Sequence, residues 1–291
     1  MVVRKQLAKQ LEERIDQVVR RRKVEEEKIA RKHELFAKRN AEIVKVMATG
    51  KVLSRNSGEE FDDIHYRVHL KYLIKQPGKI YIEEEIENRQ AAVFKETIVE
   101  DREIAVQFPT GTDDLTFFYE ENSEENRSAF TYNRLEVVRY AEKWWDNYNP
   151  AYEAFEVDCT NYVSQCIHAG GAPMRGYPNR SKGWWYQNKN WSYSWSVANA
   201  LKNHLGSSTI GLRAKEVKDP RELQLGDVIC YDFQGDGRFD HNTIVTGKDA
   251  AGEPLVNAHT YNSRMRYWAY EDSTAYTPNI QYKMYTIIDD A

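Results

Sequence analysis

The sequence predicts an α+β protein with two domains. The spacing of its apolar residues is first that of a helix, then that of strands, and in the second half of the chain a mixture of both. Residues 2–47 carry apolar side chains at helical spacing and contain neither Pro nor Gly. From Lys51 the pattern changes to alternation, which is typical of half-buried strands. The acidic segment at residues 120–128 has no periodicity and predicts a linker. We therefore expect an N-terminal domain at residues 1–130 and a C-terminal domain at residues 131–291.

The N-terminal helix has a single apolar face, which the basic run at residues 20–23 interrupts. A solvated, salt-bridged helix is the ordinary interpretation of this charge pattern. The alternative is a helix that contacts a partner or a membrane surface, and the mixed signs of its polar face speak against the membrane.

The remainder of the first domain predicts an antiparallel meander. Its clearest strand covers residues 64–74, and a turn at residues 77–79 follows. Further strand candidates are residues 80–82, 91–94 and 104–108. A long helix followed by such a meander resembles cystatin-like or NTF2-like domains in outline. His65 and His69 share one side of the first strand, but without a third ligand they are assigned no metal site.

Composition excludes several classes of protein. The formal net charge is -4 and no stripe of Lys and Arg is interleaved with aromatic residues, so nucleic acid is not an expected partner. The three cysteines include no CxxC pair and are too few for a disulfide framework. No apolar run reaches transmembrane length, and the N-terminus lacks the pattern of a signal peptide. The chain as given reads as soluble, but a removed leader would place it in the cell envelope, so its compartment is left open.

The second domain begins with a helix that Asn133 is suited to cap and that runs to about Trp145. Its apolar positions include Leu135 and Val138.

The segment FEVDCTNYVSQCIHAGG at residues 155–171 predicts a helix with a cysteine in its first turn. Asp158 is suited to the N-cap, an apolar stripe follows, and two glycines end the helix. Free N–H groups and the helix dipole stabilise a thiolate at Cys159, the form that attacks carbonyl groups. We therefore expect a depressed thiol pKa and take Cys159 as the candidate nucleophile. Cys166 and Cys230 are interpreted as small buried hydrophobes.

A base for this thiol is offered by the segment at residues 226–247. The segment predicts two strands joined by a polar loop, and His241 stands at the start of the second strand. An imidazole there can accept the thiol proton and later protonate a leaving amine. If the following hairpin is regular, a polar side chain near residue 260 lies opposite His241 and can orient it. In the strand predicted at residues 255–262, three side chains share one face: Asn257, His259 and Tyr261.

Four strings in this order resemble the putative amidase domain of the papain-like superfamily, which is related in outline to the NlpC/P60 and CHAP peptidoglycan hydrolases. They are DCTNYVSQCIHAGG, SYSWSVANAL, LGDVICYDFQGDGRFDHNTIVTG and PLVNAHTYN, and the resemblance spans residues 132–288. It implies a papain-like fold, in which the helix that carries the cysteine packs on an antiparallel sheet that carries the histidine. It also implies Cys159 as nucleophile, His241 as base, and His259 as the third catalytic residue, or Asn257 if the triad is of the Asn type. The implied activity is amide hydrolysis through a thioester, with a peptide-like substrate such as bacterial cell-wall peptidoglycan.

The oxyanion of such a reaction needs hydrogen-bond donors. The backbone N–H of Cys159 is expected to supply one, because the helix start aims it into the site. Asp158 is a secondary participant or a plain N-cap.

The polar loop before His241 matches part of a calcium-binding loop. Asp232, Asp236 and Asp240 occupy three of its ligand positions. Position 12 of the pattern holds Thr243 and not a glutamate, so a turn built by Asp and Gly is the preferred interpretation. No other cofactor is expected.

An aromatic segment at residues 183–195 is the candidate substrate-binding region. Core packing explains several of its rings, whereas an aromatic loop beside a catalytic cleft binds a glycan or stem peptide by stacking. The candidate residues are Trp184, Trp185, Trp191 and, on the later strand, Tyr261.

Two other functions fit the same residues. Cys159, His241 and His259 form a Cys/His/His set of the kind that binds zinc. A non-catalytic module that binds peptide or cell wall is the other alternative, and the presence of both Cys and His favours the enzyme.

Overall fold

The computed structural model describes residues 2–20, 26–106 and 129–290, which form an α+β protein with antiparallel sheets. These residues group into two compact units. The first unit comprises Met1–Val106, Asp249–Ala251 and Tyr261–Tyr276, and the second comprises Gln107–Lys248, Gly252–Thr260 and Thr277–Ala291. Two late segments of the chain thus belong with the N-terminal residues. The predicted linker at residues 120–128 lies outside the described residues.

Two helices open the first unit, α1 (Val2–Arg20) and α2 (Glu27–Lys38). The helix predicted to reach residue 47 is therefore too long, because strand begins at Glu42. Asn40 adopts a left-handed backbone conformation, with φ at 51°, which ends a helix and which Asn tolerates better than most residues. The β-branched residues that follow favour a strand.

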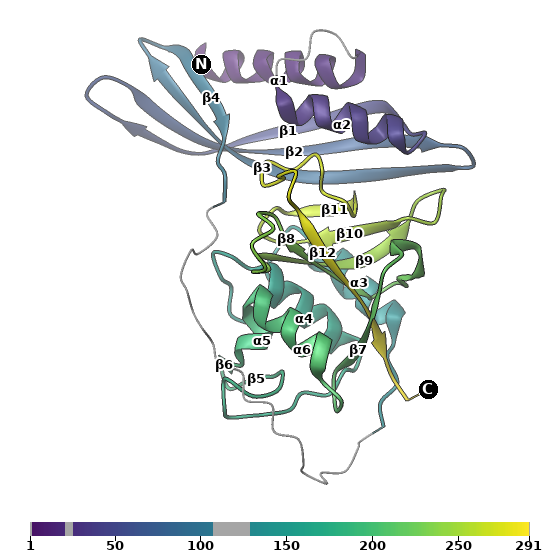
Figure 1. Cartoon of the computed structure of the whole chain (residues 1–291). Helices are drawn as coiled ribbons and strands as arrows, with labels where there is room; N and C mark the ends of the chain where they lie inside the picture. Colours follow the sequence, from purple (N-terminus) through teal and green to yellow (C-terminus); the bar gives the residue numbers. More distant parts are fainter. Residues whose placement is uncertain (1, 21–25, 107–128, 291) are drawn as a thin grey trace. The chain divides into compact units, whose positions relative to one another are not determined.

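The sheet of the first unit is an antiparallel meander around β3 (Lys79–Phe94). On one edge β3 pairs with β2 (Asp62–Gln76), which in turn pairs with β1 (Glu42–Ser57). On the other edge β3 pairs with β4 (Thr97–Glu103) and with β11 (Ser263–Tyr267). Figure 1 shows α1 and α2 lying along one face of this meander.

The strand predictions for this unit are largely confirmed. The apolar face of β2 is buried, and the turn at residues 77–79 joins β2 to β3. The candidates at residues 80–82 and 91–94 are parts of the single strand β3. The candidate at residues 104–108 is wrong for residues 104–106, which form no strand, and its last two residues lie outside the described part. Lys95 and Glu96 both adopt positive φ in a two-residue turn, so the next strand begins already at Thr97.

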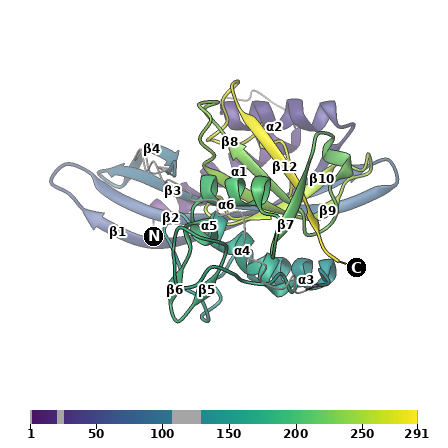
Figure 2. The same ribbon diagram turned by 60° about the horizontal axis from the view of Figure 1, so that its bottom comes forward.

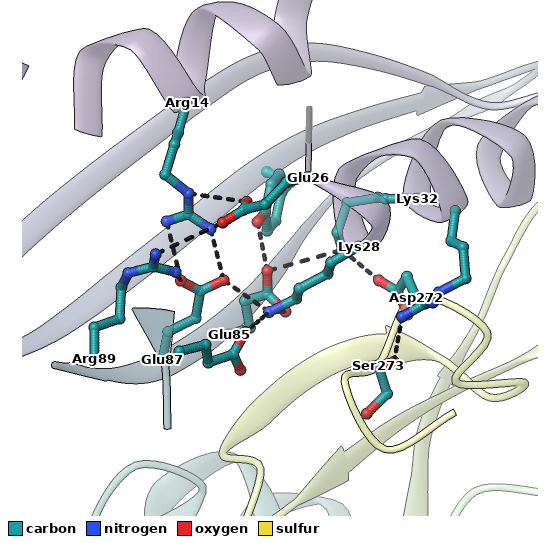
Figure 3. Close-up of polar contacts among 12 residues, drawn as sticks. Arg14, Glu26, Lys28, Lys32, Glu85, Glu87, Arg89, Asp272 and Ser273 are labelled. Carbon is teal, nitrogen blue, oxygen red and sulfur yellow. Dashed lines mark hydrogen bonds and ion pairs between the residues drawn. The ribbon is translucent and has the colours of Figure 1, made fainter. Parts of the chain in front are cut away.

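The inner face of β3 carries charges that the sequence analysis did not predict. Four charged residues, each at most 4% exposed, alternate along it: Glu83, Glu85, Glu87 and Arg89. Figure 3 shows how cations from the two helices approach two of these residues, Glu85 and Glu87. Lys28 Nζ lies 2.7 Å from Glu87 Oε1 and 3.6 Å from Glu85 Oε2, and Arg14 Nη1 lies 3.0 Å from Glu87 Oε2. The helices are therefore joined to the sheet by buried ion pairs as well as by apolar contacts.

The second unit begins with the predicted helices. They are α3 (Arg134–Trp144), α4 (Cys159–Ala169), α5 (Tyr193–Ser196) and α6 (Ala198–Ser207), with a 3-10 turn η1 (Pro220–Glu222). As predicted, the Asn133 side chain caps α3, where it accepts a hydrogen bond from the N–H of Glu136. Within α3, Val137 is buried while Leu135 is exposed, so the apolar positions are shifted from those expected. Helix α4 is buried around its whole circumference from Cys159 to Ile167, and not only along one stripe.

The sheet of the second unit is antiparallel, with the strand order β10, β9, β8, β12, β7. Its strands are β7 (Arg213–Val217), β8 (Val228–Asp232), β9 (His241–Lys248), β10 (Pro254–Ala258) and β12 (Gln281–Ile288); β5 (Tyr186–Gln187) and β6 (Asn190–Trp191) form a separate short hairpin. Figures 1 and 2 show α4, α5 and α6 close together beside this sheet, and both α4 and α6 contact β9. None of the helices in the described residues is long and apolar enough to cross a membrane.

The strand predicted at residues 255–262 is too long, because β10 ends at Ala258. Thr260 has a φ of 73°, a conformation that a β-branched residue rarely adopts and that breaks the extended chain.

Candidate active site

Cys159 is the first residue of α4 and lies against the start of β9. Its Sγ is 3.9 Å from the carbonyl oxygen of Asp240 and 3.7 Å from Oγ1 of Thr160. Only 1% of the residue is exposed. The candidate nucleophile therefore lies next to the residue that precedes His241, although Cys159 and Asp240 are 81 positions apart in the sequence.

His241 begins β9, as predicted, and is fully buried. It pairs with Tyr231 of β8, and its ring lies 5.6 Å from the Tyr231 ring and 6.0 Å from the Phe233 ring between centroids. The side chain of Asn242 points to the opposite face of the sheet, where its Nδ2 donates to Thr160 Oγ1 at 3.0 Å. The structure thus brings the candidate thiol and the candidate base to the same end of β9, with the imidazole packed against two aromatic rings.

Burial raises the pKa of the Cys159 thiol, whereas the helix position predicts a depressed pKa. The backbone N–H of Asn242 and the hydroxyl groups of Thr160 and Thr260 oppose this effect by donating to the sulfur. The predicted depression rested on the helix terminus alone, whereas desolvation of the thiolate is the largest cause of the shift in the folded chain. Burial raises the pKa of Cys166 as well, to well above its ordinary value.

His259 lies just after β10 and binds the residue that precedes α4. Its Nδ1 is 2.7 Å from Asp158 Oδ2, and its Nε2 is 2.6 Å from the carbonyl oxygen of Trp144. The ring also stacks on Tyr162, with 4.1 Å between centroids. The two bonds hold the imidazole between the residue before α4 and the last residue of α3.

Asp158 stands at the N-cap position of α4, but its side chain does not cap the helix, which corrects the prediction. Its carboxylate accepts from the N–H of Phe155 at 3.0 Å and from Nδ2 of Asn161 at 2.8 Å, in addition to His259. The side chain of Thr260 binds the N–H groups at the helix start instead. Its Oγ1 accepts from the N–H of Asp158 at 2.9 Å and from the N–H of Cys159 at 3.1 Å. The predicted oxyanion donor, the N–H of Cys159, is thus bound to a side chain of the protein itself.

Sequence reasoning pointed to position 260 without recognising this role. The predicted hairpin register is confirmed by the pairs Val256 with Val245 and Asn257 with Ile244. If this register continued, residue 260 would lie opposite residue 241, but β10 ends at Ala258, before that point. The signal for Thr260 was therefore the register, and its contacts with α4 came from the tertiary structure.

Asn257, the other alternative for the third catalytic residue, lies in β10. Its Nδ2 donates to Oε1 of Glu142 at 3.0 Å, and its Oδ1 accepts from the Thr246 hydroxyl at 2.8 Å. These bonds tie Asn257 to α3 and β9, whereas His259 is tied to the start of α4.

The candidate substrate-binding residues divide by exposure. Trp184 and Trp185 are each 1% exposed and belong to the core, whereas Trp191 is half-buried and packs edge-on against Phe155 at 4.9 Å between centroids. Tyr261 is a buried residue of the first unit. Of these four, Trp191 is the ring with accessible surface.

The loop before His241 is closed by an aspartate turn. The two carboxylate oxygens of Asp232 accept from the N–H groups of Gly235 and Gly237, each at 2.7 Å. Burial, together with the negative charge of Asp236, raises the pKa of Asp240 to about 6. Within residues 2–20, 26–106 and 129–290, no group of three or more His, Cys, Asp and Glu side chains is arranged to hold a metal ion. That range includes the candidate calcium ligands and the candidate zinc ligands.

The sequence is similar to one described family and to two proteins of Bacillus subtilis strain 168. The family model for the putative amidase domain matches residues 131–285. The uncharacterized protein YhbB is 50% identical over 270 residues, which cover 89% of this chain and 86% of YhbB. The uncharacterized protein YjcM is 32% identical over 140 residues, which cover 45% of this chain and 31% of YjcM. No solved structure gave a significant match.

Proposed function

Because the chain belongs to the putative amidase domain family, we propose that it is a cysteine-dependent amide hydrolase of the papain-like type, with Cys159 as nucleophile and His241 as base. One observation carries this proposal. The Sγ atom at the first residue of α4 lies 3.9 Å from the carbonyl oxygen of the residue before His241 and receives the N–H of the residue after it. A thiol with an imidazole as its base is the pair that nucleophilic amide hydrolysis requires.

In the proposed reaction, the imidazole of His241 removes the Sγ proton and the thiolate attacks the carbonyl carbon of the amide. The tetrahedral oxyanion then collapses, the C–N bond breaks, and the imidazolium gives its proton to the leaving amine. Water attacks the resulting thioester with His241 again as base, so that a carboxylate leaves and the thiol is restored.

The pair formed by His259 and Asp158 is proposed to fix the start of α4 and not to transfer protons. Both ring nitrogens of His259 already lie within hydrogen-bond distance of other groups, at 2.6 and 2.7 Å. The pair therefore differs from a third triad member, which would have to orient the imidazole of His241. Asn257 is proposed to hold β10 against α3 through Glu142.

The proposed substrate is a peptide-like amide of the bacterial cell wall. This rests on the resemblance to peptidoglycan hydrolases and on the half-buried ring of Trp191, which can stack on a sugar or an apolar side chain. Trp191 packs against Phe155, and the N–H of Phe155 is bound to Asp158, so this aromatic surface is linked to the residue before Cys159.

The test is incubation of the full chain with muropeptides and synthetic peptide amides, followed by mass spectrometry of the products. Cys159→Ala and His241→Ala are expected to abolish the release of amines. Cys166→Ala is the matched control, because it removes a thiol from the same helix away from its start. Retained turnover in Cys159→Ala would falsify the proposal.

A non-catalytic peptide-binding module is a second candidate, favoured by the burial of Cys159 and the raised pKa of its thiol. It predicts that the chain co-sediments with peptidoglycan while no amine is released, and that Cys159→Ala leaves this binding unchanged. If the unmodified chain releases amines and Cys159→Ala does not, while both bind peptidoglycan equally, the result supports the hydrolase.

A further inference from the structure

We propose that the hydroxyl of Thr260 occupies the place in the candidate active site that the carbonyl oxygen of a bound amide would take. The inference rests on the proposed function. It goes beyond that function because it names the group that must leave before an amide can bind.

Two backbone N–H groups converge on the hydroxyl of Thr260. Oγ1 of Thr260 lies 2.9 Å from the backbone nitrogen of Asp158 and 3.1 Å from that of Cys159. Two adjacent backbone N–H groups that converge on one oxygen at a helix start, beside a nucleophile, form the arrangement that stabilises an oxyanion. In this structure the converging oxygen belongs to the chain itself.

These two bonds use the whole capacity of the Thr260 hydroxyl to accept hydrogen bonds. A threonine hydroxyl has two lone pairs and one proton. The two N–H groups use both lone pairs, so the hydroxyl can accept no further hydrogen bond. One hydroxyl thus binds both N–H groups beside the nucleophile, which leaves neither of them for a carbonyl group.

The backbone of Thr260 is held in a costly conformation that places this hydroxyl. Thr260 has a φ of 73°, although its β-branched side chain disfavours the left-handed region. Its neighbour His259 is fixed by Asp158 and by the carbonyl oxygen of Trp144. The chain is therefore anchored on the His259 side of Thr260.

The test uses acetaldehyde as the probe and needs no knowledge of the substrate. The thiol of Cys159 adds to acetaldehyde: an S–C bond forms, the thiol proton passes to the aldehyde oxygen, and that oxygen needs the two N–H groups. The adduct protects Cys159 from iodoacetamide, so the protection, followed by mass spectrometry of the peptide that carries Cys159, gives a dissociation constant. Iodoacetamide alone reports access to the sulfur, because its displacement reaction builds no negative charge on an oxygen bound there.

Thr260→Ala removes the competing hydroxyl and is expected to bind acetaldehyde about tenfold more tightly, the equivalent of one to two freed hydrogen bonds. Thr260→Ser keeps the hydroxyl and is expected to match the unmodified chain. Thr243→Ala is the matched control, since the Thr243 hydroxyl is also buried but bonds to Tyr231, on β8. Thr260→Gly, which also removes the strain of positive φ, is the second variant should Thr260→Ala fail to fold.

The proposal is overturned if acetaldehyde binds Thr260→Ala no more tightly than the unmodified chain. It is equally overturned if the acetaldehyde affinity and the iodoacetamide rate rise by the same factor, because the change is then one of access alone. Both measurements work in a protein without turnover, so their failure is distinguishable from a failure of the proposed hydrolase function.

Discussion

Lys32 of α2 is the residue through which the buried charges of the first unit are best tested. Its Nζ lies 2.6 Å from Asp272 Oδ2 and 2.9 Å from Glu83 Oε1, and only 2% of each of the Lys32 and Glu83 side chains is exposed. Burial alone lowers the pKa of Lys32, but the charges of Asp272 and Glu83 more than offset it, so the pKa is raised and the ammonium stays charged. The perturbation is Lys32→Met, which keeps the length of the side chain and removes the charge.

The expected cost follows from what the substitution leaves behind. Asp272 keeps Arg266 as a partner at 2.7 Å, whereas Glu83 loses its cation and has a second oxygen, Oε2, without a hydrogen-bond partner in the described residues. Removing one member of a buried ion pair costs about 3–5 kcal/mol, because the other charge remains desolvated. Total stabilities of about 5–15 kcal/mol are usual, so this is a large part of the whole.

The assay is urea unfolding followed by far-UV circular dichroism. Lys9→Met is the matched control, because Lys9 is 76% exposed and its pair with Glu13, at 3.7 Å, should contribute less than about 1 kcal/mol. Adding Glu83→Gln to Lys32→Met should recover part of the loss, since the unpaired charge is then absent. If Lys32→Met costs no more than Lys9→Met, the reasoning from burial is refuted.

Three further predictions concern the second unit. Gly170→Ala should cost about 1–3 kcal/mol in urea unfolding, because a Cβ there would lie 2.7 Å from the Tyr132 ring, whereas Gly50→Ala, with nothing within 4 Å, should cost far less. Burial lowers the pKa of His204 from 6.5 to about 4, so between these pH values the unfolded chain binds a proton at His204 and the folded chain does not. The free energy of unfolding should therefore fall by up to about 3 kcal/mol as the pH falls from 6.5 to 4. His204→Gln should flatten that part of the stability profile. Iodoacetamide should modify Cys159 faster than the other two cysteines, because three donors oppose the effect of burial on its thiol, and equal labelling in peptide mass spectrometry would contradict this.

The pattern of side chains along short segments determined much of the local structure. The alternation at residues 64–74 predicted β2 and its buried face, and Asn133 predicted the start of α3. The glycines after Ala169 and the cysteine at the other end predicted the extent of α4. These features depend on neighbours within a few residues, which is why periodicity and capping residues reveal them.

The tertiary structure alone decided the environment of the candidate site. It placed the sulfur of Cys159 beside Asp240, gave the helix N–H groups to Thr260, and bound His259 to Asp158. It also reversed the expected direction of the Cys159 pKa, because the cost of desolvating a thiolate depends on what covers it. Partners and solvent exposure are set by residues about a hundred positions apart in the chain, and no local pattern encodes the distances between them.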